Sequence, residues 1–483
     1  MKQHSALFRL IFLCSLEGKR DILWPVMKRV LKPTSRRNFL KEMLLGGTAC
    51  AVLPSYVLGL HGETSPNSKL AIAFVGIGGR GGHNLNGLCG EKVVALCDVD
   101  EARCVDQRKR FEKVPFYQDY RVMLDKHEKE IDAVAVSTPD HTHAIILKNA
   151  MQRGKHVFSE KPLAHSIHEE LALDRLARES KVVTQAGNQG RSYDSIRVFR
   201  EWLEDGVIGQ VKEAHLMCNS SYSFISRLGE LKEKHEVPKT LDWDLWLGGA
   251  AYRDYHPLYV PGVWRFWRDF GSGVLGDWIC HIADPLFYAL ALDYPSTITA
   301  HPVDYDPKKY AQVFPVSSEI EFEFKVGGRE KPLKVTWYEG KCRPPRPAGF
   351  EDPDKKFPGI GPEFFEMGGH IIGDKGDILY GSHGATGVKV LDEEKMKSLS
   401  QEPTRIPKSP GYHQEWINAC KGEGTAESPF SYCGKLTEVG LLGCIAMLFP
   451  GEKLEWDGRL AKFTNNEKAN EYLNPPARKG WEV

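Results

Sequence analysis

Short, continuous runs of apolar residues recur in the first half of the chain from residue 69 onward. They are Lys69–Val75, Val93–Cys97, Ile131–Val136 and His156–Ser159. An apolar run of this length is typical of a strand buried on both faces, as in a parallel sheet. Segments with helical character lie between them, at His83–Cys89 and from about Ala144 to Arg153. The alternation of strand and helix predicts a doubly wound, parallel α/β domain of the Rossmann type.

The second half of the chain has a different pattern. We expect strands at Val211–Cys218, Ser317–Val326, Leu333–Tyr338, His370–Ile372 and Val388–Leu391. Apolar and polar residues alternate within Ser318–Phe324, which predicts a sheet with one solvated face, and Glu321 and Glu323 are assigned to that face. The proline-rich stretch Cys342–Pro362 predicts a long loop, either a lid near the site or a disordered segment.

The first predicted strand runs directly into a glycine-rich turn. Gly76, Gly78 and Gly81 form a GxGxxG pattern that also contains Gly79 and Arg80. Such glycines make a tight turn, let the backbone approach a pyrophosphate, and let the following helix pack closely on its strand. The next strand ends in Asp98, where a carboxylate can bind both ribose hydroxyls of NAD and repel the 2′-phosphate of NADP. The sequence therefore predicts a dinucleotide site that prefers NAD.

Polar residues also follow the other predicted strands. Thr138 and Pro139 follow the third strand, and His141 and His143 come next, where we expect the following helix to start. The segment Glu160-Lys161-Pro162 follows the fourth strand. Asn188 and Gln189 follow what we interpret as the last strand of this domain. Ligands of open α/β sheets bind at the carboxyl ends of the strands. We therefore expect Thr138, Pro139, His143, Glu160, Lys161, Asn188 and Gln189 to contact the cofactor.

Charge and cysteine content narrow the function classes. Acidic and basic residues balance at 64 each, which gives no electrostatic basis for binding nucleic acid or a charged membrane surface. The 11 cysteines include no CxxC pair, and the spacing of His141 and His143 is poor for a metal site, so we predict none.

The first residues have the pattern of a targeting signal rather than of a folded domain. Arg36 and Arg37 precede the weakly apolar run Met43–Leu53, as in a twin-arginine export signal, and Ser65–Ser68 has the composition of a linker. We expect residues 1–68 to be leader, signal and linker, with Met27 as a more natural start than Met1. Export through this pathway predicts a periplasmic or otherwise exported protein, folded before transport.

Together, Gly76/Gly78/Gly81, Asp98, Thr138-Pro139, Glu160-Lys161-Pro162 and Gly276–His281 resemble the Gfo/Idh/MocA family, which includes glucose–fructose oxidoreductase and inositol 2-dehydrogenase. The resemblance implies an NAD-binding Rossmann domain at 69–187. It also implies an α/β domain at 188–483 that has an open, mostly antiparallel sheet for substrate binding and subunit pairing. A homo-oligomer is expected.

Hydride transfer from a secondary alcohol requires a base for the hydroxyl proton. Asp277 and His281 are four residues apart, so on a helix they share a face, and a carboxylate neighbour would raise the basicity of the imidazole. Pro285 predicts a kink just beyond them. By resemblance, His281 is the general base, Lys161 the electrostatic partner and proton relay, and Asp277 the orienting residue and a substrate contact.

Trp264 and Arg265 precede this helix and are candidates for stacking and hydrogen bonding to a sugar, as is His413 at the start of a later helix.

The expected activity is oxidation of a secondary hydroxyl of a sugar, glycoside or polyol, with NAD bound tightly because free NAD is scarce outside the cytoplasm. An NAD-assisted glycoside hydrolase or epimerase without net redox change is an alternative. A metal-dependent lyase that uses Asp277, His281 and His413, and a non-catalytic sugar- or dinucleotide-binding protein, are further alternatives.

Overall fold

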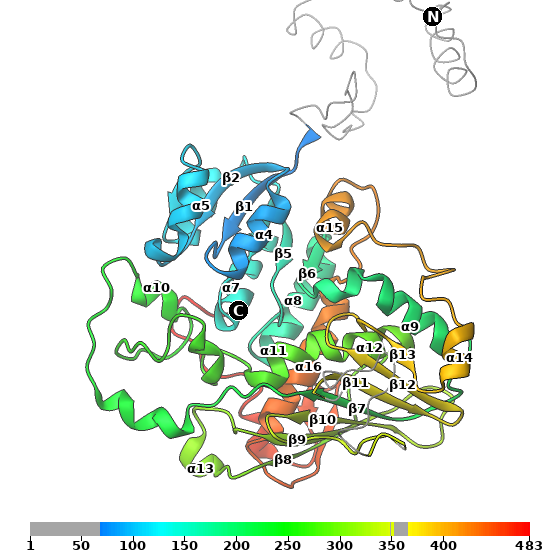
Figure 1. Ribbon diagram of the computed structural model, residues 1–483. Helices are drawn as coiled ribbons and strands as arrows, with labels where there is room; N and C mark the ends of the chain where they lie inside the picture. Colours follow the sequence, from blue (N-terminus) through cyan, green and yellow to red (C-terminus); the bar gives the residue numbers. More distant parts are fainter. Residues whose placement is uncertain (1–67, 348, 352–365) are drawn as a thin grey trace, which may run out of the picture. The chain divides into compact units, whose positions relative to one another are not determined.

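A computed structural model describes residues 68–347, 349–351 and 366–483 of the protein (Figure 1). The predicted export signal lies outside the described residues, as does most of the second half of the predicted loop Cys342–Pro362. Lys69–Val483 form one compact unit that contains two sheets.

The first sheet has six parallel strands in the order β3-β2-β1-β4-β5-β6, which is the Rossmann order. The strands are β1 (Ala71–Val75), β2 (Lys92–Cys97), β3 (Phe116–Tyr117), β4 (Ala133–Val136), β5 (His156–Ser159) and β6 (Thr184–Ala186). Every residue of β1 and β4 is buried, which explains their continuous apolar runs. The predicted parallel sheet is therefore confirmed, β6 is the last strand expected before Asn188, and the short strand β3 is added.

The two predicted helices of this half, α4 (Arg80–Leu88) and α7 (Asp140–Gln152), begin earlier than expected. Three further helices were not predicted: α5 (Val105–Arg110), α6 (Tyr120–His127) and α8 (Ile167–Ser180). Pro139 is the N-cap residue of α7, so the helix starts four residues before the predicted Ala144. His141 and His143 lie in the first turn of α7, which confirms the helix-start position expected for them.

The second sheet has nine strands in the order β13-β12-β11-β7-β10-β9-β8-β14-β15. They are β7 (Val211–Cys218), β8 (Thr297–Pro302), β9 (Ser318–Phe324), β10 (Leu333–Glu339), β11 (Met367–Gly373), β12 (Gly376–Gly381), β13 (Lys389–Val390), β14 (Leu454–Asp457) and β15 (Lys462–Phe463). Only β7 and β10 pair in parallel, so the sheet is mixed and mostly antiparallel, as expected. β8, β12, β14 and β15 were not predicted.

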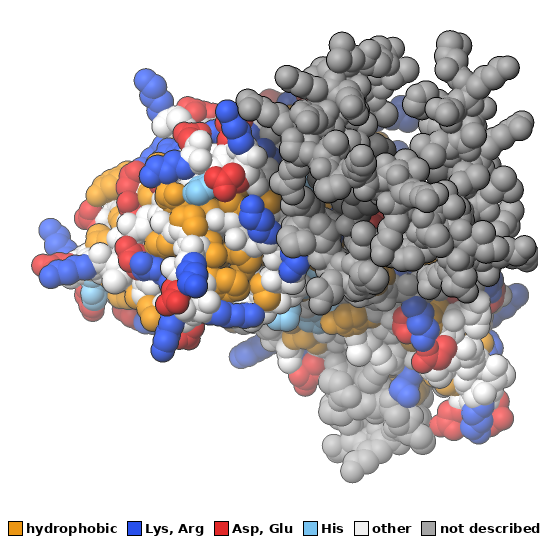
Figure 2. Space-filling view, turned by 90° about the horizontal axis from the view of Figure 1, so that it is seen from above, with side chains coloured by type: hydrophobic (Ala, Val, Ile, Leu, Met, Phe, Trp, Pro, Cys, Tyr) orange, Lys and Arg blue, Asp and Glu red, His pale blue; other side chains and the backbone are white. Residues whose placement is uncertain are grey.

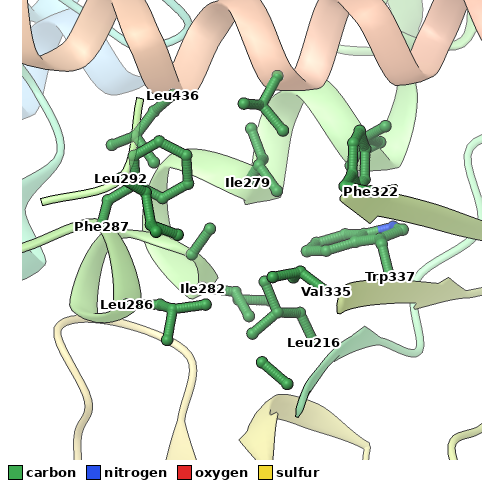
Figure 3. Packing of buried hydrophobic residues seen from close by; sticks show 14 of the residues in the cluster. Leu216, Ile279, Ile282, Leu286, Phe287, Leu292, Phe322, Val335, Trp337 and Leu436 are labelled. Carbon is green, nitrogen blue, oxygen red and sulfur yellow. The ribbon is translucent and has the colours of Figure 1, made fainter. Parts of the chain in front are cut away.

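Helices cover one face of this sheet and enclose the largest core. They include α9 (Asp194–Glu204), α11 (Gly273–Ile282), α12 (Asp284–Leu290) and α16 (Phe430–Ala446). Figure 3 shows Val335 and Trp337 of β10 pointing toward Ile279 of α11, with Leu436 of α16 nearby. The alternation in β9 follows from this packing, because Ile320 and Phe322 enter the core.

At the kink predicted near Pro285, one residue, Ala283, separates two helices and keeps right-handed helical backbone angles. α11 ends at Ile282, and α12 begins at Asp284 with Pro285 in its first turn, where proline is tolerated. The remaining α-helices of the described residues are α10 (Trp243–Leu247), α13 (Pro307–Tyr310), α14 (Glu393–Ser398), α15 (Tyr412–Cys420) and α17 (Glu467–Asn470).

On the coloured part of the face seen in Figure 2, basic and acidic side chains are interspersed, in agreement with the balanced composition. Within the described ranges, no helix combines the length and apolar character needed to cross a membrane.

Candidate functional site

A cavity of about 610 Å³ opens at the carboxyl ends of the Rossmann strands and extends to α11. Among the residues predicted to bind cofactor, those that line it are Gly76, Gly78, Gly79, Arg80, Asp98, Thr138, Pro139, Glu160, Lys161 and Gln189. The predicted catalytic and substrate residues Trp264, Arg265, Asp277 and His281 line it as well. Gly81, His143, Asn188 and His413 are not among the lining residues.

The glycine turn between β1 and α4 is shaped by close backbone contacts. Gly76 has φ +76°, and a Cβ there would lie 2.7 Å from the carbonyl oxygen of Ser137. A Cβ on Gly81 would lie 1.8 Å from the carbonyl oxygen of Gly76, so this residue lets α4 pack against the turn. The cradle therefore fits a pyrophosphate at the start of α4, as in dinucleotide-binding domains.

Asp98 organises the same turn. Its Oδ2 accepts hydrogen bonds from the backbone N–H groups of Ile77 (2.9 Å) and Gly78 (3.0 Å), and its Oδ1 accepts one from Asp100 (3.0 Å). Burial raises the pKa of the Asp98 carboxyl, although these backbone bonds oppose the rise. The carboxylate borders the cavity, where the ribose of a dinucleotide would lie.

Lys161 and Asp277 form a buried ion pair between the two halves of the chain. Lys161 Nζ donates to Asp277 Oδ1 at 2.5 Å and to the Asp277 backbone oxygen at 2.8 Å. Burial alone would raise the pKa of the Asp277 carboxyl, but Lys161 and Arg265 beside it hold the pKa below its usual value. The pair fixes an ammonium group at the wall of the cavity.

His281 lies one turn after Asp277 on α11, but Asp277 does not raise the basicity of the His281 imidazole as the sequence suggested. Burial lowers the pKa of the His281 imidazole well below its usual value, and Lys161, His383 and Arg80 lower it further. The predicted rise in the basicity of His281 is therefore wrong. The oxygens of Asp277 bond to Lys161 and Tyr222 and lie near Arg265, so this carboxylate orients the lysine.

His143 supports the lysine segment from behind. Its ring is buried, and its two nitrogens lie 2.8 Å from the carbonyl oxygens of Pro162 and Thr138. The predicted contact of His143 with the cofactor is replaced by a bridge between the loops that follow β4 and β5. His141 is also buried and faces the carbonyl oxygens of Trp246 and Phe270.

Arg80 is held at the cavity by three groups. Its Nε donates to Glu160 Oε1 (2.9 Å), and its Nη2 donates to Gln189 Oε1 and Tyr412 OH (3.2 Å each). Asn188, in contrast, is buried and donates to Asp284 Oδ2 at 3.1 Å. Of the two predicted amides, the structure brings only Gln189 to the cavity.

The sequence analysis missed Tyr222 and Asp140 at the substrate end. Tyr222 OH donates to Asp277 Oδ2 and accepts from Trp278 Nε1, each at 3.2 Å. Burial raises the pKa of Asp140 to about 6, and Arg265 opposes that rise. No local motif marks either residue, because each acquires its neighbours only through the tertiary fold. Arg265 lies over the Trp264 ring at 4.1 Å and completes this end of the site.

His413 lies elsewhere. Its Nε2 is 3.0 Å from Asn84 Oδ1, and a Cβ on Gly87 would collide with its ring, so it packs α15 against α4. The structure does not bring His413 to Asp277 and His281, as the metal-dependent alternative requires. In the part of the chain that the structure describes, no group of three His, Cys, Asp or Glu side chains is arranged to hold a metal ion.

A segment that follows the Rossmann domain, residues 239–262, lines the cavity on the side of Asp98 and the loop after β2, and we call it the covering segment. The Asp242 N–H donates to the Val99 oxygen (2.9 Å), and the Glu101 N–H donates to the Thr240 oxygen (3.0 Å). Its residues Leu241, Leu245, Trp246, Val260, Pro261 and Gly262 line the cavity. Trp481 also lines the cavity, and Arg478 donates to the Gly248 oxygen of the covering segment at 2.7 Å.

Two family models match the chain. Residues 70–188 match the NAD-binding Rossmann fold of the Gfo/Idh/MocA oxidoreductase family, and residues 196–329 match its C-terminal α/β domain. Together the matches cover just over half of the chain.

Individual curated proteins and solved structures are also similar to this chain. The chain is 31% identical over 244 residues to glycosyl hydrolase family 109 protein 2 of Akkermansia muciniphila (41% of this chain, 50% of that protein). It is 26% identical over 198 residues to levoglucosan dehydrogenase of Pseudarthrobacter phenanthrenivorans (41% and 42%). The matched segments thus span half the length of these relatives or less. An inositol dehydrogenase homologue of Azotobacter vinelandii, solved with NADH and myo-inositol, has a TM-score of 0.54 at 16% identity over 80% of this chain and 98% of that chain.

The glycine cradle, the acid-tipped second strand and the second sheet agree with both family models. The chain therefore belongs to the Gfo/Idh/MocA family of oxidoreductases and carries its NAD-binding Rossmann domain.

Proposed function

We propose that the chain is an NAD-dependent oxidoreductase that oxidises a secondary hydroxyl of a sugar, glycoside or polyol and keeps its NAD bound. The Lys161–Asp277 pair carries this proposal, since it fixes an ammonium group in the same cavity as the glycine cradle and Asp98. A fixed cation at this position can stabilise the alkoxide that develops as an alcohol is oxidised.

When bound, NAD supplies a nicotinamide that accepts hydride. Lys161 polarises the substrate oxygen, and Asp277 keeps the ammonium group aimed at it. His281 is the base: its lowered pKa keeps the imidazole unprotonated near pH 7, and the weaker base that results relies on Lys161 to stabilise the alkoxide as the proton leaves. Trp264, Arg265 and Tyr222 border the substrate end and offer an aromatic face and hydrogen-bond donors.

The names of two relatives support a carbohydrate-like substrate. One is a levoglucosan dehydrogenase, and the inositol dehydrogenase homologue was solved with myo-inositol. The covering segment supports retention of the cofactor, because its residues line the cavity and are hydrogen-bonded to the loop that follows β2.

A second candidate function uses the same residues without net redox change. The relative with 31% identity is named as a glycosyl hydrolase, and a covered groove suits an enzyme that reoxidises its own cofactor in each cycle. In such a cycle, oxidation at one carbon assists hydrolysis or epimerisation, and the hydride then returns to the sugar.

The decisive experiment is to measure nucleotide retained by the purified, folded protein, by absorbance and mass spectrometry. Firmly bound NAD(H) supports a closed cycle, and a glycoside screen for keto-sugar formation, hydrolysis or epimerisation then separates the two candidates. Empty protein that binds added NAD supports a dehydrogenase that releases its cofactor. Protein that binds no NAD contradicts the proposal.

We also propose export through the twin-arginine pathway, based on Arg36, Arg37 and the apolar run after them. Changing both arginines to lysine in the full-length chain should retain the protein in the cytoplasm, as measured by cell fractionation. Equal export of the double variant would contradict the proposal. A homo-oligomer stays a prediction, to be checked by light scattering.

A further inference from the structure

His281 lacks the hydrogen bond that usually orients a histidine base. Its Nδ1 is buried and has no partner among the described residues, and the neighbouring Asp277 is bonded to Lys161 instead. In most sites of this kind, a partner on one ring nitrogen fixes the orientation of the other. Another contact must therefore hold the His281 ring.

Two aromatic rings enclose His281. The centroid of the His383 ring lies 4.2 Å from that of His281, with 36° between the planes, and the Trp278 ring lies 5.8 Å away at 70°. Trp278 and His383 also contact each other, at 5.6 Å and 75°. The three rings thus form one packed group.

His383 is firmly anchored in the turn between β12 and β13. Its Nδ1 lies 2.9 Å from Ser382 Oγ, and Ser195 Oγ donates to the Gly384 oxygen at 2.7 Å. Just before the turn, Tyr380 OH donates to the Ile282 oxygen at 2.8 Å, at the end of the helix that carries His281. The turn and α11 are therefore tied together beside the two rings.

Charge is compatible with this packing. Burial, Lys161 and Arg80 lower the pKa values of both imidazoles, while Asp277 partly opposes the effect on His383. Two neutral rings can pack against each other without charge repulsion.

We propose that His383 is a positioning residue that holds His281 in its working orientation by ring packing in place of a hydrogen bond. This inference rests on the proposed function, in which His281 takes the substrate proton. It assigns to the turn after β12 a role in the reaction that the sequence motifs do not include. A role as a proton relay would instead require the ring nitrogens of His383.

Two substitutions separate packing from proton transfer. His383→Phe keeps an aromatic ring without titratable nitrogens, so kcat should stay within about 3-fold of wild type. His383→Ala removes the ring, and kcat should fall about 10-fold or more because of lost orientation, while KM and retained NAD change less than about 2-fold. His301→Ala, at an exposed histidine on β8, is the matched control and should leave all three unchanged. Equal loss in the Phe and Ala variants, or no loss in the Ala variant, overturns the proposal.

A readout independent of turnover completes the test. In crystal structures of the NAD-containing protein, His281 should occupy one rotamer in wild type and His383→Phe, and more than one in His383→Ala. One unchanged rotamer in all three overturns the proposal. If the wild-type protein turns over no sugar while His281 is displaced in His383→Ala, the proposed function is refuted. That combination would leave the positioning role of His383 intact. His383→Leu, which keeps bulk without a planar ring, replaces the Ala variant if that one does not fold.

Discussion

At the scale of single residues, the site is organised around Lys161. The side chain has two acceptors on one residue, the carboxylate and the backbone oxygen of Asp277, and its surroundings are buried. An ammonium group restrained in this way can stabilise developing negative charge without first having to reorganise.

Lys161→Ala tests this role. We expect kcat to fall by about 100-fold or more, because the charge next to the substrate oxygen is lost, whereas retained NAD should change little. Steady-state kinetics and nucleotide absorbance give the two readouts. The exposed Lys113→Ala is the control, and a kcat for Lys161→Ala similar to that of this control would contradict the assignment.

The pH dependence of activity tests His281 as the base. Its pKa lies below that of an ordinary histidine, so the imidazole stays unprotonated as the pH falls through 6.5. The acidic limb of kcat/KM should therefore lie below pH 6.5. Asp140, whose pKa is raised to about 6 by burial, could add a limb of its own, and Asp140→Asn separates the two. An acidic limb above pH 6.5 that persists in Asp140→Asn contradicts the assignment.

Sequence reasoning found the residues that follow predicted strands, since strand ends of a parallel sheet meet at one edge. It failed for His413, which begins a helix as an active-site residue could, but which the fold directs against Asn84. It could not find Tyr222, whose partners are distant in sequence. The turn Gly381–Gly384 contains a histidine, His383, between glycines, which could have indicated a functional residue. Nothing in the local sequence, however, connected His383 with α11.

At the scale of elements, helices α8 and α16 enclose two acidic side chains. Burial raises the pKa of Glu170 to about 8 and that of Glu438 to about 7, and each lies on one of these helices. Gly434 permits the approach, because a Cβ there would lie 2.1 Å from Glu170 Oε1.

Glu170→Gln should stabilise the protein in a pH-dependent way. The folded pKa of Glu170 is raised, so the folded chain keeps a proton that the unfolded chain releases above about pH 4.5, and stability is lost as the pH rises toward 8. The Tm difference between Glu170→Gln and wild type should therefore grow from pH 5 to pH 8.5. Exposed Glu179→Gln should show no such trend, and a constant difference for Glu170→Gln would contradict the assignment.

The covering segment and the residues around Trp481 predict slow release of NAD. Trp481 packs near Tyr120, with 6.4 Å between ring centroids, and Arg121 lies over its ring at 4.7 Å. Trp481→Ala should open this side of the groove and accelerate dissociation of NAD about 10-fold, measured by fluorescence of NADH during dilution. Half-exposed Tyr472→Ala is the control, and equal dissociation rates in both variants would contradict this role.

At the scale of the whole molecule, the central strands of the Rossmann half could be predicted because they leave continuous apolar runs, whereas the short strand β3 and the helices α5, α6 and α8 could not. In the second half, β9 could be predicted from its alternation of Glu319, Glu321 and Glu323 with buried residues. The strand β8 was missed because Thr297–Pro302 has a weak pattern that ends in proline, and it forms through pairing with β9 and β14. Such pairing depends on residues far away in the chain.

Removal of NAD should lower the stability of the whole chain. The cavity joins the Rossmann strands to the covering segment, so a bound dinucleotide contacts both and favours the folded state. Protein stripped of nucleotide should melt several degrees below the same protein with NAD at about 100 times Kd. Equal Tm values in differential scanning calorimetry would contradict a cofactor held by both halves.

The distribution of the cavity lining along the chain has a consequence for biosynthesis. Val75, residues of the covering segment and Trp481 border the same space, although the ribosome makes them at very different times. The glycine cradle emerges early, but the wall of the cavity is complete only when Trp481 has left the exit tunnel. Firm retention of the cofactor is therefore expected only after residue 481 has been translated, and a protein exported in folded form would have to wait for that step.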